Sequence, residues 1–109
     1  MPFTEEYAGE EPTRAELDAT QGAAVVEFGA TWCGHCQAAR PLVEELLGGE
    51  RTVAHYKVED ARGKRLGRTF AVKLWPTLIF LLDGREVARV VRPRDPAALN
   101  DALAQIKSR

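Results

Sequence analysis

The chain contains only two cysteines, Cys33 and Cys36, in the stretch WCGHC. A structural disulfide there would close a very short loop, and the stabilisation from a disulfide grows with loop length. Covalent haem attachment requires a histidine directly after the second cysteine, but Gln37 stands there. A structural zinc site needs four ligands. Besides the cysteines only His35 and His55 are plausible, and His35 is poorly placed to share a metal with both neighbouring thiolates. We therefore expect no metal and favour a redox-active pair.

The position of the pair at the start of a helix favours thiol chemistry. Free backbone N–H groups and the helix dipole stabilise a thiolate at Cys33, and a protonated His35 would add a positive charge beside it. Cys36 lies one helical turn further on, so it can face the same side and act as the resolving thiol. The alternative is a pair of small buried hydrophobic residues. Trp32, Gly34 and the helix start argue against that alternative.

Glu27 is a carboxylate inside the most hydrophobic run of the chain, AAVVEF. Charged groups are rarely buried without a partner or a function. A buried Glu27 would be a possible proton acceptor for Cys36, whereas a Glu27 at a sheet edge would simply be solvated. Lys57 on the neighbouring strand could be its charge partner, although a solvated lysine is the simpler interpretation of that residue alone.

The tripeptide Trp75-Pro76-Thr77 directly precedes the apolar run LIFLL. A trans proline there would only mark the start of a strand. A cis proline would expose the backbone of Trp75, which could pair with an extended substrate segment. The residues alone leave the isomer open.

The elements that must position these residues alternate between helix and strand. A capping box, Thr13 with Glu16, opens the first helix, and Asp83-Gly84 is typical of a hairpin turn. The order implies an α/β protein with one central mixed sheet flanked by helices. The expected elements are helix 13–22, strand 23–28, helix 33–47, strand 52–59, helix 62–70, strands 78–82 and 86–91, and a last helix that Asp95 caps and Pro96 begins.

Length and composition limit the protein class. The 109 residues suit one domain, which we place at 13–109 after a loosely held acidic arm at 1–12. The net charge of −1 gives no general attraction to nucleic acid or membrane, and no apolar run is long enough to span a bilayer. No signal peptide is visible at the N-terminus, which predicts a cytoplasmic location. We expect a monomer.

Several separated motifs resemble the thioredoxin family over about residues 13–107. VVEFGATWCGHCQAARP matches the family's strand, active-site motif and kinked helix, KVED its central strand, WPT its cis-proline loop and DGREV its hairpin. The resemblance implies a thioredoxin fold, a nucleophilic Cys33, a resolving Cys36, a buried acid Glu27 with partner Lys57, and cis-Pro76. It also implies no cofactor beyond the cysteine pair, protein disulfides as substrates, and a thiol or electron-donor reductase as partner.

The chain also departs from thioredoxin proper. His35 and Glu27 resemble the catalytic domains of protein disulfide isomerase, Gly29 replaces a usual aromatic residue, and VVRPRD lacks the usual glycine near residue 93. The family's first strand is weak or missing, and Trp75 is bulky where substrates lie. These features argue against thioredoxin's broad substrate range.

Three functional hypotheses follow. The first is a cytosolic disulfide reductase that cycles Cys33 and Cys36. The second is a disulfide oxidase or isomerase, which His35 and Glu27 favour and the missing signal peptide opposes. The third is a binding module that uses the groove near Trp75, with vestigial redox activity.

Overall fold

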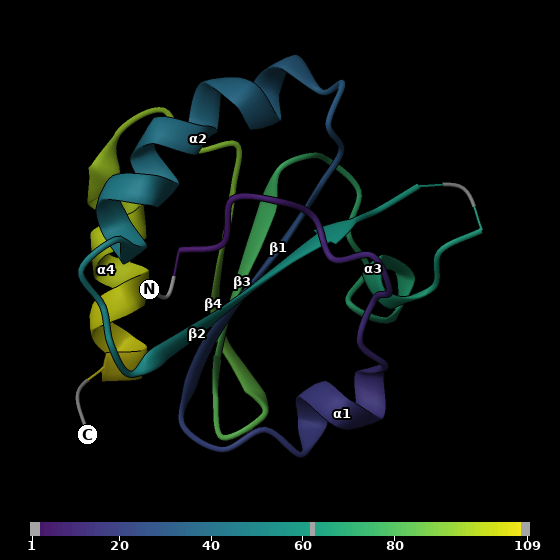
Figure 1. Ribbon diagram of the computed structural model, residues 1–109. Coiled ribbons are helices and arrows are strands. Elements are labelled where there is room, and N and C mark those ends of the chain that lie inside the picture. The colour runs from purple at the N-terminus through teal and green to yellow at the C-terminus, as the bar shows by residue number, and fades with distance from the viewer. Residues whose placement is uncertain (1–2, 62, 108–109) are drawn as a thin grey trace.

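The computed structural model describes residues 3–61 and 63–107, and its helices and strands follow the predicted order (Figure 1). Each predicted strand is present to within one residue at either end. The elements are α1 (Arg14–Asp18), β1 (Ala23–Gly29), α2 (Gly34–Leu47), β2 (Val53–Glu59), α3 (Leu66–Thr69), β3 (Thr77–Leu82), β4 (Arg85–Val91) and α4 (Pro96–Lys107).

The strands form one mixed sheet in the order β2-β1-β3-β4, which confirms the predicted architecture. β1 pairs in parallel with β2 and antiparallel with β3, and β3 pairs antiparallel with β4. The two central strands are therefore β1 and β3, whose hydrophobic runs need burial on both faces. In the β1–β2 register Glu27 lies opposite Lys57, so both belong to the same face of the sheet.

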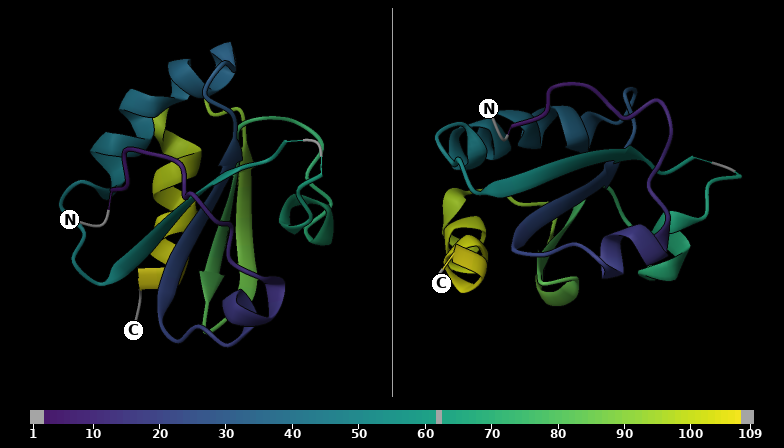
Figure 2. Two further views of the ribbon diagram at one scale, coloured as in Figure 1. Left: turned by 45° about the vertical axis from the view of Figure 1, so that its right-hand side comes forward. Right: turned by 60° about the horizontal axis from the view of Figure 1, so that its bottom comes forward.

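Helices cover both faces of the sheet (Figure 2). α2 and α4 pack on the face that carries Val25, Leu78 and Phe80, and their leucines complete that cluster. α1 and α3 pack on the opposite face, against Val26 and Ile79. Because side chains alternate along a strand, Glu27 shares the face of Val25 and lies on the side of α2.

Two helices are shorter than predicted. α1 ends at Asp18, and Gly22 adopts a left-handed φ of 82° before β1 begins. α3 covers only Leu66–Thr69. Its predicted start, Arg62, lies outside the described residues, and Gly63 has a φ of 87°, which a right-handed helix cannot include.

The N-terminal arm is held against β2, so the prediction of a loosely held segment is wrong for residues 3–8. The backbone N–H of Thr4 donates to His55 Nδ1 over 2.8 Å, and its hydroxyl donates to His55 O over 2.9 Å. Lys57 Nζ donates to Glu5 O, and Ala8 N donates to Lys57 O. Residues 3–12 nevertheless include no strand, as expected.

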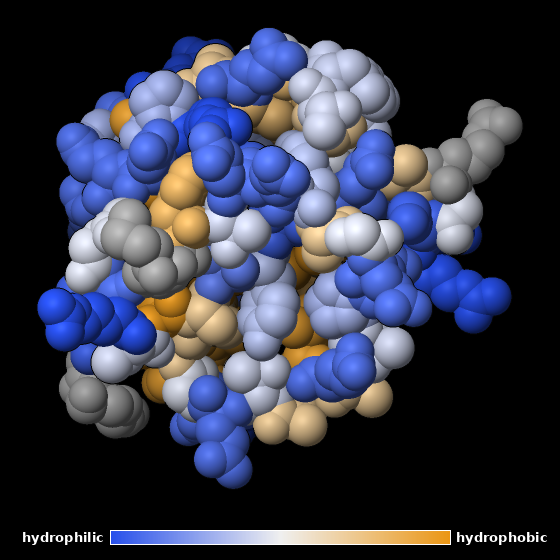
Figure 3. Space-filling model, viewed as in Figure 1, coloured by the Kyte–Doolittle hydropathy of each residue, from blue (hydrophilic) through white to orange (hydrophobic). Residues whose placement is uncertain are grey.

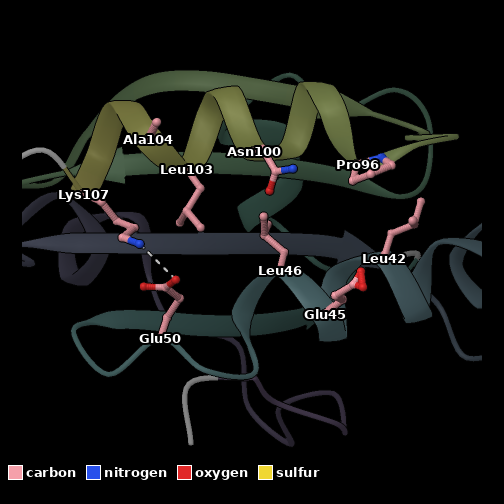
Figure 4. Close-up of a pocket in the computed structure, with 9 residues that line it drawn as sticks. All are labelled: Leu42, Glu45, Leu46, Glu50, Pro96, Asn100, Leu103, Ala104 and Lys107. Carbon is pink, nitrogen blue, oxygen red and sulfur yellow. Dashed lines mark hydrogen bonds and ion pairs between the residues drawn. The ribbon is translucent and has the colours of Figure 1, made fainter.

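The surface viewed in Figure 3 is mainly hydrophilic, with its apolar side chains in separate patches. A groove of about 620 Å³ lies between α2 and α4, and an ion pair from Lys107 to Glu50 crosses one end of it (Figure 4). Leu42, Leu46 and Leu103 supply its apolar lining. Neither cysteine contributes to this groove, so it lies outside the candidate active site.

Candidate active site

The N-terminus of α2 holds the cysteine pair. Cys33 is the N-cap residue, a position that usually requires a side-chain acceptor, and its sulfur accepts a hydrogen bond from the backbone N–H of Cys36 over 3.2 Å. Both cysteines are free and nearly buried, with exposed fractions of 7% for Cys33 and 5% for Cys36. The helix start therefore directs a backbone N–H at the Cys33 sulfur. Gly34 and His35 between them are exposed.

The two thiols are electrostatically unequal. Burial and the hydrogen bond with Cys33 raise the pKa of Cys36 to about 12, and the negative charges of Cys33 and Glu27 add to the shift. A backbone hydrogen bond at Ala30 opposes it. Cys36 therefore keeps its proton at neutral pH, as a resolving thiol must until the mixed disulfide has formed.

Glu27 is buried beneath the pair, as the sequence predicts. Its Oε1 lies 2.9 Å from Nε2 of His55, which is also buried. Because His55 Nδ1 accepts the N–H of Thr4, the proton of a neutral ring lies on Nε2, which donates to the carboxylate. Sequence reasoning considered His55 only as a metal ligand. The sequence could have indicated His55 as a neighbour of Glu27, because His55 lies two residues before Lys57 and therefore on the same face of β2.

The expected ion pair between Lys57 and Glu27 is not formed. The Lys57 ammonium instead donates to Glu5 O over 3.0 Å and lies 4.8 Å from the centroid of the Tyr7 ring. His55 takes the place beside the carboxylate. The arm offers the ammonium a carbonyl and an aromatic face, and the sequence did not predict this contact.

The peptide bond between Trp75 and Pro76 is cis. Trp75 packs against the cluster of Ala30, Cys33 and Cys36 and donates from Nε1 to Asp60 Oδ2 over 2.9 Å. Its ring meets that of Trp32 edge to face, with centroids 5.3 Å apart, while Trp32 is 70% exposed. An aromatic, partly open surface therefore flanks Cys33.

Hydrogen bonds hold the cis-proline loop in place. Thr77 is buried and donates from its hydroxyl to Leu74 O over 2.6 Å, which makes it a support of the loop. Arg92 donates from its backbone N–H to Pro76 O and from Nε to Trp75 O over 2.7 Å. The Trp75 carbonyl, part of the backbone that the sequence offered for substrate pairing, thus already accepts one hydrogen bond. Sequence reasoning missed this role of Arg92, whose signal is an arginine in the run VVRPRD.

A hollow of about 530 Å³ opens beside Cys36. The arm supplies Tyr7 to its lining, and Lys57 and Arg40 also contribute. Sequence reasoning did not assign any of the arm to the site, because the contact joins segments far apart in the chain.

The site shows no evidence of a metal centre. Within residues 3–61 and 63–107, no group of three or more His, Cys, Asp or Glu side chains could hold a metal ion. In the same part of the chain, no helix is long and apolar enough to cross a membrane.

Comparison with known proteins decides the family, since the thioredoxin family model matches residues 7–105. The chain belongs to the thioredoxin family. It is 39% identical over 80 residues to thioredoxin-2 of Saccharomyces cerevisiae, covering 73% of this chain and 76% of that protein. It is 38% identical over 86 residues to a thioredoxin of Mycolicibacterium smegmatis, covering 72% and 77%.

A solved structure agrees over nearly the whole chain. Thioredoxin 2 from Pseudomonas aeruginosa PAO1, in its reduced form, superposes with a TM-score of 0.84 and 54% identity, covering 95% of this chain and 96% of that one. Thioredoxins are thiol–disulfide oxidoreductases that use a redox-active cysteine pair and no cofactor. This chain is therefore a thiol–disulfide oxidoreductase with a CXXC motif at Cys33 and Cys36. The family model begins at Tyr7, inside the segment that the sequence assigned to an arm.

Proposed function

We propose that this oxidoreductase is a monomeric, cytosolic disulfide reductase with Cys33 as nucleophile and Cys36 as resolving thiol. The Cys33 thiolate attacks one sulfur of a substrate disulfide, a Cys33–substrate disulfide forms, and the other substrate sulfur leaves as a thiolate that takes a proton. Cys36 then loses its proton, and its thiolate attacks the Cys33 sulfur. The second substrate thiolate leaves, so two electrons reach the substrate and the Cys33–Cys36 disulfide remains for a thiol or electron-donor reductase to reduce.

The hydrogen bond from Cys36 N–H to Cys33 Sγ carries this assignment. It directs a helix N-terminal N–H at one sulfur only, and an N–H donor favours a thiolate over a thiol. Cys36 also has a backbone hydrogen bond, at Ala30, but burial, Cys33 and the charge of Glu27 outweigh it and raise its pKa. The assignment of attacking and resolving roles follows from this difference.

Glu27 is the proposed acceptor of the Cys36 proton. Its charge acts on Cys36, and its carboxylate accepts only one described hydrogen bond, from His55. An acceptor-only group with a free oxygen near the thiol can take up the proton directly or through a water. Lys57 contacts the arm and not Glu27. We therefore assign Lys57 no proton transfer in this step, and its ammonium lies beside the ring of Tyr7.

The proposed substrate surface surrounds the cis-proline loop. Trp32 and Trp75 offer aromatic faces, and Trp75 packs against the cluster that contains Cys33. Arg92 Nε occupies one acceptor site of the Trp75 carbonyl, so an extended peptide must pair beside this side chain or displace it. This requirement supports a narrower substrate range than an unobstructed loop would have.

Single cysteine variants test the cycle. Insulin reduction with dithiothreitol as donor is expected to be lost in Cys33→Ser, because the remaining thiol, Cys36, keeps its proton at neutral pH. In Cys36→Ser the first attack still occurs, so the variant is expected to accumulate a mixed disulfide when it is reduced, freed of dithiothreitol and mixed with insulin, and not to turn over. Full insulin reduction by Cys33→Ser, or steady turnover by Cys36→Ser, would contradict the proposed roles.

A further inference from the structure

The arm brings a tyrosine to the resolving thiol, at a place where the sheet leaves room for it. Gly29 ends β1 beside the cysteine pair and has no side chain. A Cβ atom at that position would lie 2.6 Å from Cys36 Sγ and 3.0 Å from the Tyr7 hydroxyl oxygen. The first distance is shorter than real Cβ contacts show, and the second is at their tight limit. The Tyr7 hydroxyl and the Cys36 sulfur therefore border the same small space, which a glycine leaves open.

Contacts on both sides fix Tyr7 in this position. The carbonyl of Glu5 accepts a hydrogen bond from Lys57 Nζ, and the N–H of Ala8 donates to Lys57 O over 2.8 Å. The Lys57 ammonium also lies 4.8 Å from the Tyr7 ring centroid, a cation–π distance. Residues before, at and after Tyr7 thus bind one residue of β2, which orients the ring toward the hollow that Cys36 lines.

The chemistry of Tyr7 suits a hydrogen-bond donor. Burial raises its pKa above the ordinary value, and the negative charges of Cys36 and Glu27 and a hydrogen bond with Cys36 add to the shift. The hydroxyl therefore stays protonated throughout the physiological range. A neutral hydroxyl can donate to a sulfur without exchanging its proton.

We infer that Tyr7 belongs to the active site, where its hydroxyl donates a hydrogen bond to the Cys36 sulfur and stabilises the thiolate that forms there during resolution. Tyr7 gains and loses no atom in the cycle. Its contribution is greatest when Cys36 carries negative charge and weakest when Cys36 is part of a disulfide, whose sulfur is a poor acceptor. Tyr7 therefore favours the reduced pair. The inference rests on the proposed resolving role of Cys36 and extends it to a residue of the arm.

The chain contains only two tyrosines, which provides a matched control. Tyr7→Phe removes the hydroxyl and keeps the ring against Lys57. Tyr56→Phe makes the same change on β2, where Tyr56 packs against the cluster on the opposite face of the sheet. Because Cys36 is protonated at neutral pH, only the difference between a thiol and a disulfide acceptor counts. Equilibration in glutathione buffers is therefore expected to shift Tyr7→Phe toward the disulfide by roughly two- to fivefold, which corresponds to a potential about 10–20 mV more reducing. Tyr56→Phe is expected to match the wild type.

A second measurement uses the unmodified protein and so does not depend on how well a variant folds. The NMR signal of the Tyr7 hydroxyl-bearing carbon is expected to move between the reduced and oxidised states, and that of Tyr56 is expected to stay. The inference would be overturned if Tyr7→Phe and Tyr56→Phe had the same equilibrium constant with glutathione. It would also be overturned if the Tyr7 signal had the same chemical shift in the reduced and oxidised states. Failure of the cysteine roles is recognised separately, by steady turnover in Cys36→Ser.

Discussion

At the residue scale, the difference between the two cysteines comes from which groups face each sulfur. Cys33 accepts an N–H at the helix start, whereas Cys36 is surrounded by buried surface, by Cys33 and by the charge of Glu27. Residue type alone makes the two thiols equivalent. Their surroundings differ, and this difference supports the proposal that Cys33 attacks and Cys36 resolves.

The pKa of Cys36 predicts how stability depends on pH. Because the pKa of Cys36 is raised from 9.0 to about 12 in the folded state, the folded protein holds this proton more tightly than the unfolded chain does. The corresponding stability is fully present below about pH 9 and is lost as pH rises toward 12. The slope contributed by one such group is at most about 1.4 kcal/mol per pH unit.

Urea unfolding of the reduced protein between pH 8 and about 10.5 measures this slope. Cys36→Ala lacks the titrating thiol, so its free energy of unfolding is expected to fall less steeply over the same range. Both proteins carry Tyr7→Phe in this comparison, because Cys36 itself raises the pKa of Tyr7. Parallel slopes for the two proteins would contradict the raised pKa.

At the element scale, α2 and the arm each position different groups of the site. The first turn of α2 places both cysteines and supplies the N–H groups, while the arm covers the open edge of β2. Thr4 fixes the tautomer of His55, which in turn holds Glu27. The arm thus reaches the buried carboxylate through His55 and reaches Cys36 through Tyr7.

Removing the first part of the arm tests its contribution to stability. A chain that begins at Tyr7 loses both hydrogen bonds of Thr4 and the Lys57–Glu5 bond. At about 1 kcal/mol each, these bonds predict a loss of roughly 1–3 kcal/mol. Differential scanning calorimetry would record it as a fall in Tm.

Glu5→Gln is the matched control for this deletion. It removes only the exposed ion pair with Arg40 and is expected to cost less than about 1 kcal/mol. A deletion that leaves Tm at the level of Glu5→Gln would show that the arm contributes nothing beyond a surface pair.

At the scale of the whole molecule, the reduction potential of the Cys33–Cys36 pair depends on all the contacts that the two sulfurs make. We expect the Cys33–Cys36 pair to have a potential near about −270 mV, that of a reductase, when equilibrated with glutathione. A potential near about −180 mV, typical of protein disulfide isomerase, would contradict the reductase direction.

His35→Ala is the informative variant, because it removes an exposed imidazole beside the pair and leaves both sulfurs in place. It is expected to make the potential more reducing.

The sequence by itself determined the order of the elements, the mixed sheet and the cysteine pair. These follow from local signals, such as apolar runs, the capping box at Thr13 and the spacing of Cys33 and Cys36 along a helix. The burial of Glu27 was also predictable, because its neighbours on β1 are all apolar. Patterns of this kind act within a few residues, so they can be recognised without knowing what packs against them.

Only the tertiary structure decided the partners of the buried groups. His55 replaced Lys57 beside Glu27, the arm was held against β2, and Tyr7 reached Cys36 through the space at Gly29. The contacts of His55 and of the arm join segments that are far apart in the chain. The position of Tyr7 also depends on Gly29, which has no side chain. A hydrogen bond depends on the position and direction of both partners to within a fraction of an ångström, and packing sets those positions.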